Sequence, residues 1–267
     1  MLESRTMHDP LRVGLVGFGA IARGVVRLLR AEDDVDLVGA LVADQGKSRD
    51  ETAPKIFGSV EELLEQRPEV VVELAGHAAL RSYGPPILRA GVDLMLVSVG
   101  ALAEPAVEQA IVEAACAGRS RAIVVSGAIG GLDAIAAAGV GGLSRVTHTT
   151  RKPARALLSA SEAAELREPR ELFRGSAREG AMRFPESINV AAAVSLAGIG
   201  LDRTEVCVIA DPNVDRNLHE VVAQGEFGEL RFEIRNIPTD DNPRTGRLVA
   251  MSVVHALRRR RATLVVG

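Results

Sequence analysis

Residues 11–22, Leu-Arg-Val-Gly-Leu-Val-Gly-Phe-Gly-Ala-Ile-Ala, carry the clearest structural signal in the chain. Their first half is a short, mainly apolar run, which is typical of a buried parallel strand. Residues 21–29 then repeat apolar side chains at helical spacing. The order of strand, glycine-rich turn and helix predicts the first unit of a doubly wound parallel sheet.

The turn itself, Gly17-Phe-Gly-Ala-Ile-Ala22, predicts a dinucleotide-binding site. Gly17 permits the tight turn, and Gly19 lets the backbone approach a pyrophosphate. Ala20 and Ile21 open the helix, whose free N–H groups attract that anion. Asp44 follows roughly 20 residues later, near the end of the second predicted strand, where a carboxylate bonds the adenosine ribose hydroxyls.

The residues after Asp44 leave the choice of dinucleotide open. A carboxylate repels a 2′-phosphate, so Asp44 favours NAD. Lys47 and Arg49 follow closely and could receive that phosphate, which would allow NADP. They are equally well explained as charges of a solvated loop.

Strand and helix patterns continue to alternate as far as about Gly127, which predicts a Rossmann sheet with right-handed crossovers. The carboxyl ends of its strands are where ligands bind. Small residues there, in the segments 75–77, 98–100 and 126–131, suit close approach of the nicotinamide ribose and ring. We therefore expect Ala75 and His77 to contact the cofactor. The predicted strands are residues 36–42, 69–74, 94–98 and 122–126, and the predicted helices are residues 60–66, 85–90 and 104–117.

The pattern changes after Gly127, which predicts a second, α+β domain. Residues 229–235 alternate apolar and charged side chains, as a half-solvated strand does. The preceding Gly225-Glu-Phe-Gly228 predicts a hairpin turn. The other expected elements are strands at 145–150, 205–210 and 263–266 and helices at 187–198 and 248–258.

Composition excludes several classes of protein. Hydrophobic residues make up 47% of the 267 residues, which is too many for a disordered chain. A net charge of −3 and only 3% aromatic residues argue against nucleic-acid binding. Cys116 and Cys207 make no disulfide framework and no zinc spacing, so we expect two buried thiols and no metal. Apolar stretches are too short for a signal or a membrane span, which predicts a cytoplasmic protein.

Several motifs together resemble the L-aspartate dehydrogenase family. They occur in the family's order and cover nearly the whole chain from Leu11. The motifs are Gly17–Ala22, Glu73–His77, Ser126–Asp133, Arg151–Pro153, Phe184–Val190, Ala210–Pro212, Asn217–His219, Asn236–Pro238 and Asn242–Thr245.

The resemblance implies a reversible reaction and a fold. The enzymes oxidise L-aspartate with NAD or NADP to iminoaspartate, which gives oxaloacetate and ammonia or feeds NAD biosynthesis. The resemblance also implies a catalytic role for His219 and cofactor contacts for Ala128 and Asn189. It implies a Rossmann domain at residues 1–127 and 240–267. Residues 128–239 would form a substrate and dimerisation domain like the catalytic domain of glyceraldehyde-3-phosphate dehydrogenase, in a homodimer.

Residue chemistry agrees with this reaction. Histidine has an ordinary pKa near neutrality, which suits His219 for taking a proton from the amine. We expect it on a loop bordering the second sheet, with His77 as the rival base. His148 and His255 fall on predicted regular structure and are expected to be core or surface residues.

The two carboxylates of aspartate require cations or donors. Arg151 and Lys152 are the candidates, because guanidinium and ammonium groups bind carboxylates. Thr239 and the segment 242–245 offer hydroxyl and amide donors. Asn189 could hold the nicotinamide carboxamide, cap a helix, or do both.

Two other functions stay open. One is a related two-domain reductase, similar to dihydrodipicolinate reductase or homoserine dehydrogenase, against which the Asn217–His219 and Phe184–Val190 motifs argue. The other is a Rossmann protein that senses the NAD(H) ratio without turnover. The fold alone does not separate these functions.

Overall fold

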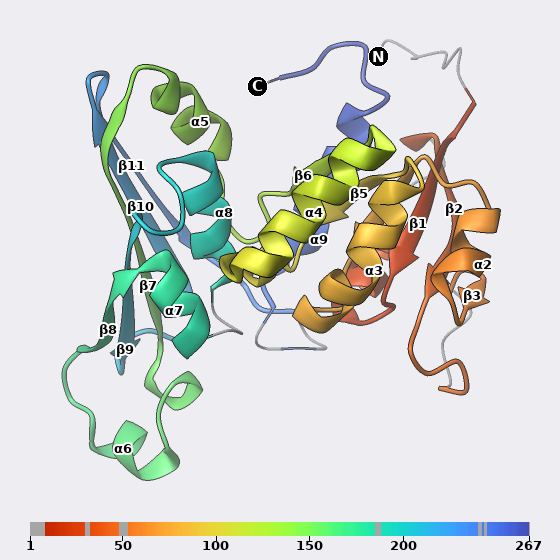
Figure 1. The fold of residues 1–267 in the computed structure, drawn as a ribbon. Coiled ribbons are helices and arrows are strands. Elements are labelled where there is room, and N and C mark those ends of the chain that lie inside the picture. The colour runs from red at the N-terminus through yellow and green to blue at the C-terminus, as the bar shows by residue number, and fades with distance from the viewer. Residues whose placement is uncertain are drawn as a thin grey trace, which may run out of the picture. The chain divides into compact units, whose positions relative to one another are not determined.

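The computed structural model describes residues 9–29, 33–47, 53–184, 188–239, 242 and 245–266 (Figure 1). Arg49 and parts of the Phe184–Val190 and Asn242–Thr245 motifs lie outside these residues. The chain divides into two compact units. Unit 1 comprises Met1–Ser98, Ala106–Val125 and Val249–Gly267, and unit 2 comprises Val99–Pro105 and Ser126–Leu248.

Unit 1 is built on a six-stranded sheet of order β3-β2-β1-β4-β5-β6. Every pair of neighbouring strands is parallel, which confirms the predicted Rossmann sheet. Its central strands are mainly apolar and buried, as a parallel sheet with helices on both faces requires. They are β1 (Leu11–Val16), β2 (Val35–Leu41), β3 (Ile56–Phe57), β4 (Val70–Glu73), β5 (Asp93–Leu96) and β6 (Ala122–Val124).

Helices cover this sheet. In Figure 1, α3 and α4 lie in front of the sheet and α9 lies behind it. A Cβ built on Gly24 of α1 would lie 3.0 Å from Ala250 of α9, so these two helices pack closely. Ser59 caps α2, because its Oγ accepts from Glu62 N at 3.2 Å. The helices are α1 (Ala20–Leu28), α2 (Val60–Glu65), α3 (His77–Arg89), α4 (Pro105–Gly118) and α9 (Leu248–Arg259).

Unit 2 contains a five-stranded mixed sheet of order β11-β10-β7-β9-β8. Strands β7 and β9 are parallel, and the other neighbours are antiparallel. The predicted hairpin is confirmed, since Gly225 pairs with Gly228 at the turn between β10 and β11. The strands are β7 (Leu143–Pro153), β8 (Arg170–Ser176), β9 (Glu205–Asp211), β10 (Leu218–Gly225) and β11 (Gly228–Arg235).

One face of this second sheet carries the core of unit 2. Val146 of β7 and Val221 of β10 pack with Ile135 of α5 and Val194 of α8. Figure 1 shows α5, α7 and α8 on the same side of the sheet. The helical elements are α5 (Leu132–Val140), α6 (Ala160–Glu165), α7 (Ala177–Arg183), α8 (Asn189–Ala197) and the 3₁₀ turns η2 (Val99–Ala103) and η3 (Ala154–Ala156).

One predicted element is wrong, and one predicted helix begins earlier than expected. Residues 263–266 are not a strand, because they pair with no described strand and Leu264 and Val266 are 86% and 80% exposed. Helix α3 begins at His77 rather than near residue 85, although Pro85 and Pro86 lie inside it. Adjacent prolines normally end a helix, which is why the sequence favoured a later start.

Candidate active site

A tight turn joins β1 to α1 in unit 1. Gly17 has a φ of +91°, which side chains other than glycine's rarely tolerate. Its N–H donates to the Leu41 carbonyl at 2.8 Å. A Cβ at this position would lie 2.7 Å from the Ala75 side chain, which is closer than two carbon atoms can approach. Both the backbone and the packing therefore require glycine here.

Gly19 is the N-cap residue of α1. A Cβ built on Gly19 meets no atom within 4 Å, so the backbone there borders open space. Ala20 and Ile21 begin the helix, and N–H groups in a first turn have no partner within the helix. This arrangement can bind an anion at the helix N-terminus.

A cavity of about 720 Å³ lies beside this turn. It is large enough for an organic ligand of cofactor size. The structure thus brings four predicted cofactor residues to one cavity. The residues lining it include Gly17, Gly19, Arg23, Asp44, Lys47 and Ala75.

Asp44 and Lys47 lie on the exposed loop that follows β2. Asp44 Oδ1 accepts from the Gly46 N–H at 2.9 Å, which fixes the carboxylate at the cavity wall. A carboxylate suits ribose hydroxyls, whereas an ammonium group suits a phosphate. Residues for both kinds of dinucleotide therefore line the same cavity.

Glu73, at the end of β4, organises the loops next to this cavity. Its carboxylate is 1% exposed. One oxygen accepts from the N–H groups of Ala75 and Gly76 at 2.8 and 2.9 Å. Ser98 donates to the carboxylate from its N–H at 3.0 Å and from its hydroxyl at 2.9 Å. The sequence showed Glu73 only as part of a motif, and a carboxylate ending an otherwise apolar buried strand was the available signal.

Replacing Glu73 by Gln should destabilise the protein by roughly 1–3 kcal/mol, because the amide places a donor against other buried donors. Dinucleotide binding should weaken as well, since Ala75 and Gly76 lose their acceptor. Urea unfolding and dinucleotide titration measure the two effects. Glu65→Gln, an exposed change in α2, is the matched control, and equal stability of the two variants would contradict the expectation.

His77 is the first residue of α3 and is half-buried. Gly76 precedes it as the N-cap with a φ of +100°. Ala75 and Ala78 on either side line the cavity described above, whereas His77 is not among its lining residues. His77 therefore lies next to this cavity at a helix start.

In unit 2, Ala128 and Asn189 hold separate loops in place. The Asn189 side-chain oxygen accepts from the Gly100 N–H at 2.8 Å and so ties α8 to η2. Ile188, not Asn189, is the N-cap of α8, so the capping alternative is wrong. The Ala128 carbonyl accepts from Asn236 Nδ2 at 2.8 Å, which fixes the loop before α5.

His219 lies within strand β10, so its expected place on a loop is wrong. It is 5% exposed. His219 pairs across the sheet with Thr150 of β7, and His148 of β7 is a diagonal neighbour on the same face. His148 Nε2 lies 3.2 Å from His219 Nδ1, and the two rings are inclined by only 17°. The structure therefore places a second buried histidine against the predicted catalytic one.

Both rings are uncharged at neutral pH. Burial lowers the pKa of His148 to about 3, and the positive charge of Lys152 acts in the same direction. Burial also lowers the pKa of His219 well below 6.5, with smaller effects of His148 and Lys152. Uncharged imidazoles can accept protons, which is what a general base requires.

Burial of neutral His148 should make the protein sensitive to acid. In the unfolded chain His148 binds a proton below about pH 6.5, whereas in the folded chain it does so only below about pH 3. The free energy of unfolding therefore decreases as the pH is lowered from about 6.5 to about 3. By about pH 5 the loss should be roughly 2 kcal/mol for this histidine. Urea unfolding of the wild type and of His148→Leu near pH 7 and pH 5 measures the difference. If both proteins lost the same free energy of unfolding between pH 7 and pH 5, this prediction would be contradicted.

The two candidate substrate cations point to opposite faces of β7, because side chains alternate along a strand. Lys152 shares the face of His148 and Thr150, as the electrostatic effect of Lys152 on both histidines also indicates. Arg151 lies on the other face, where it forms an ion pair with Asp211 at 3.6 Å. The structure thus brings Lys152, and not Arg151, together with His219.

Thr239, the third candidate, lies after β11 in a turn. Its N–H donates to the Thr245 carbonyl at 2.8 Å, and its hydroxyl donates to the Asn242 carbonyl at 2.9 Å. Asn242 N–H donates back to that hydroxyl at 3.2 Å. The hydroxyl therefore stabilises this turn.

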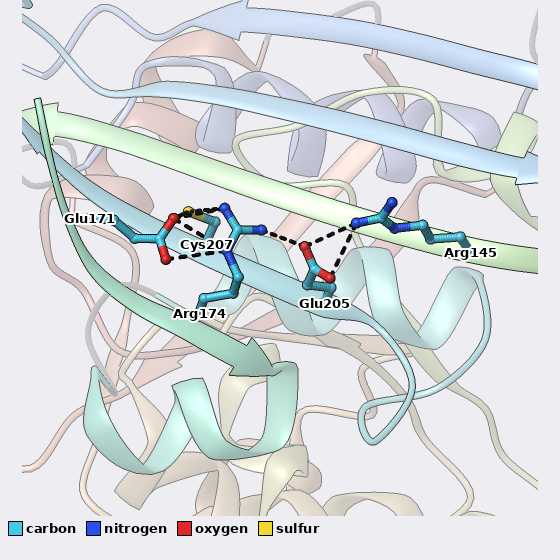
Figure 2. Close-up of polar contacts among 5 residues, drawn as sticks. All are labelled: Arg145, Glu171, Arg174, Glu205 and Cys207. Carbon is cyan, nitrogen blue, oxygen red and sulfur yellow. Dashed lines mark hydrogen bonds and ion pairs between the residues drawn. The ribbon is translucent and has the colours of Figure 1, made fainter.

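The face of the second sheet that bears Arg151 also carries a chain of ion pairs, which Figure 2 shows. Arg174 contacts Glu171 at 2.7 Å and Glu205 at 2.6 Å, and Arg145 contacts Glu205 at 3.3 Å. The buried Cys207 thiol donates to Glu171 at 3.2 Å. Burial and that carboxylate raise the pKa of Cys207 to about 11, so it stays a thiol.

Other expectations about residue types have mixed outcomes. Cys207 is buried, but Cys116 is exposed, so the prediction of two buried thiols is wrong for Cys116. His255 lies exposed on α9. Among the described residues, no cluster of three His, Cys, Asp or Glu side chains is arranged to hold a metal. No helix in the described part of the chain is long and apolar enough to cross a bilayer.

Comparison with known proteins covers most of the chain. The family model described as "Homoserine dehydrogenase, NAD binding domain" matches residues 17–125, and "Aspartate dehydrogenase, C-terminal" matches residues 133–260. An L-aspartate dehydrogenase from Ralstonia pickettii is 42% identical over 257 residues, covering 92% of this chain and 96% of that protein. The chain belongs to the L-aspartate dehydrogenase family.

Further members of the family agree. The L-aspartate dehydrogenase of Cupriavidus necator is 44% identical over 258 residues, with the same coverage of 92% and 96%. The crystal structure of aspartate dehydrogenase from Thermotoga maritima has a TM-score of 0.79 at 25% identity, covering 96% of this chain and 99% of that one. An archaeal homoserine dehydrogenase in complex with NADPH, at 11% identity and a TM-score of 0.57, shares the fold.

Proposed function

We propose that this protein is an NAD(P)-dependent L-aspartate dehydrogenase. It oxidises L-aspartate to iminoaspartate, which water converts to oxaloacetate and ammonia. The observation that carries the proposal is a buried, uncharged His219 on the same sheet face as Lys152, in a chain of this family. The homoserine dehydrogenase and dihydrodipicolinate reductase alternatives have less support, because their structures are only 11% and 14% identical to this chain.

Unit 1 provides the residues that fit a dinucleotide. The open space at Gly19 suits the pyrophosphate, as do the N–H groups of Ala20 and Ile21, which lie in the first turn of α1 and have no partner within that helix. Asp44, at the wall of the same cavity, suits the adenosine ribose. When bound, the nicotinamide ring supplies the hydride acceptor for the α-carbon of aspartate.

Other contacts to the dinucleotide are assigned from the family resemblance and from donor chemistry. We assign Ala75, His77 and Ala128 to the nicotinamide end. The Asn189 side-chain oxygen accepts from the Gly100 N–H, which fixes the orientation of the amide. The amide group in this orientation can bond the nicotinamide carboxamide.

His219 takes the proton in the oxidation step. The α-carbon loses a hydride with two electrons, the nitrogen loses a proton, and a carbon–nitrogen double bond forms. Neutral His219 accepts the proton of the amino group. The two carboxylates of bound aspartate oppose the positive field of Lys152, so the proton affinity of His219 rises when the substrate is present.

Lys152 should bind a substrate carboxylate. Lys152→Met should raise KM for L-aspartate by roughly 10-fold or more, because one charged contact of this kind contributes about 1.5–3 kcal/mol. Dinucleotide affinity should not change. Arg151→Met is the matched control, since Arg151 lies on the opposite face beside Asp211 and should alter KM far less. A larger effect in the Arg151 variant would reverse the assignment.

Reduction of the cofactor, followed by its absorbance, tests the proposed function. The purified protein is mixed with NAD and then with NADP at alkaline pH. L-Aspartate, D-aspartate, L-glutamate and L-homoserine are offered in parallel. Reduction with L-aspartate alone is expected. Silence with all four amino acids, together with measured dinucleotide binding, would favour the sensor function, and reduction with L-homoserine would favour the homoserine alternative.

We further propose that the protein is a homodimer in the cytoplasm. The resemblance to the family favours a dimer, and two free cysteines suit a reducing compartment. We assign the interface to the domain of residues 128–239, as the resemblance to the family implies. Light scattering should give a mass of about twice 28.2 kDa. The monomer mass would contradict the dimer.

A further inference from the structure

The contact between His148 and His219 has no role in the reaction described so far. His148 is completely buried, and its Nε2 faces His219 Nδ1 at 3.2 Å. The two residues are 71 positions apart in sequence, and the pairing of β7 with β10 makes them diagonal neighbours. Side chains in diagonal positions reach each other only when they are long or aromatic, as two histidines are.

We propose that His148 is a positioning residue that selects the tautomer of His219. In this arrangement His219 Nδ1–H donates to His148 Nε2, and the lone pair of His219 Nε2 remains available for the substrate proton. This inference rests on the proposed function of His219 as the base.

The donors and acceptors of the two rings support this assignment. Two nitrogens 3.2 Å apart share one proton, so one ring donates and the other accepts. If His148 Nε2 donated instead, the proton of His219 would sit on Nε2, and the ring would present an N–H donor to the substrate in place of a lone pair. A base at Nε2 therefore requires His148 to accept, which puts the proton of His148 on its own Nδ1.

The residues around the two rings are consistent with His148 Nε2 as the acceptor for His219 Nδ1–H. Among the described residues, no carboxylate acts electrostatically on either ring. His148 Nδ1 is buried without a hydrogen-bond partner whichever ring donates, so this nitrogen does not favour the opposite tautomer. The neighbouring strands present apolar side chains to this face: Val206, Val208 and Ala210 from β9, Val221 from β10 and Ile234 from β11.

The electrostatics fit a neutral acceptor. Lys152 is the charged side chain that acts on both rings, and it disfavours a second positive charge there. His148 consequently stays neutral when His219 becomes an imidazolium. An imidazolium that donates Nδ1–H to a neutral imidazole keeps its ring orientation throughout the proton transfer, which is the role a carboxylate plays beside many catalytic histidines.

Two variants of His148 test the proposal. Leucine fills a similar volume without an acceptor, whereas glutamine can place its side-chain oxygen near the position of Nε2. His148→Leu should fold and bind dinucleotide normally, with kcat lowered roughly 10- to 100-fold and KM for L-aspartate little changed. His148→Gln should recover most of the lost kcat. Equal losses in both variants would indicate a packing role and overturn the proposal, as would a His148→Leu kcat within about twofold of the wild type.

A readout that does not depend on activity accompanies these variants. ¹⁵N NMR of labelled histidines distinguishes protonated from unprotonated ring nitrogens, and the His219→Ala spectrum identifies the signals of His219. The wild type should show His219 protonated at Nδ1, and His148→Leu should lose that preference. A wild-type His219 protonated at Nε2 would contradict the tautomer assignment. If His219→Ala itself retains full activity, the proposed base fails, whereas an inactive His219→Ala beside a normal His148→Leu overturns only the role of His148.

Discussion

His219→Ala should lower turnover with L-aspartate by roughly 10²- to 10⁴-fold, the usual contribution of a positioned general base. The variant loses the imidazole that accepts the amine proton. Binding of the dinucleotide should survive, because its predicted cavity is lined by residues of unit 1. Steady-state kinetics and dinucleotide titration on the same preparation separate the two properties.

His255→Ala is the control for this experiment, since His255 is exposed on α9 and should be replaceable without effect. His77→Ala tests the rival base. Near-normal turnover of His219→Ala together with a large loss in His77→Ala would move the proton step to His77. Thermal unfolding of each variant shows whether the fold is retained.

Gly19→Val should weaken dinucleotide binding by roughly 10-fold or more, with only a small loss of thermal stability because valine is a poorer N-cap than glycine. A side chain at Gly19 meets no protein atom within 4 Å, and the backbone φ of −93° suits any residue. The valine therefore enters the space at the N-terminus of α1 that the pyrophosphate is expected to fill. Titration with NAD and NADP, alongside thermal melting, measures both properties.

Gly17→Ala provides the contrast. Its φ of +91° and its 2.7 Å contact with Ala75 should lower the free energy of unfolding by roughly 1–3 kcal/mol. Unchanged dinucleotide affinity in a stable Gly19→Val protein would contradict binding of the pyrophosphate at this turn.

Most of the parallel sheet of unit 1 could be predicted because its longer strands are mainly apolar runs, whereas β3, with two residues, is too short to show a pattern. Burial on both faces leaves mainly apolar side chains at β1, β4 and β5, where the exceptions are Arg12, Glu73 and Asp93. The dinucleotide turn could be predicted because local backbone geometry imposes Gly17, whereas Gly19, whose conformation suits any residue, leaves open space for a ligand.

Unit 2 was harder to predict. Strand β8 lies at a sheet edge and is mostly polar, so Arg170–Ser176 resembles a loop in sequence. Helix α5 contains alanine and glycine without a clear periodicity. The sequence also did not indicate α7, whose capping box of Ser176 and Glu179 was the available signal.

The pairing of His148 with His219 depends on the register of β7 with β10, which no local pattern specifies. Part of this arrangement could nevertheless be predicted from the sequence. Within a strand, alternation alone puts His148, Thr150 and Lys152 on one face and Arg151 on the other.

Transfer of deuterium from L-aspartate labelled at its α-carbon tests the central claim most directly. The labelled substrate is incubated with the protein and the preferred dinucleotide, and the reduced dinucleotide is examined by mass spectrometry. Oxidation at the α-carbon predicts deuterium in the reduced dinucleotide and formation of oxaloacetate and ammonia. Deuterium that remains in unreacted aspartate, with no reduced dinucleotide formed, would contradict the proposed reaction.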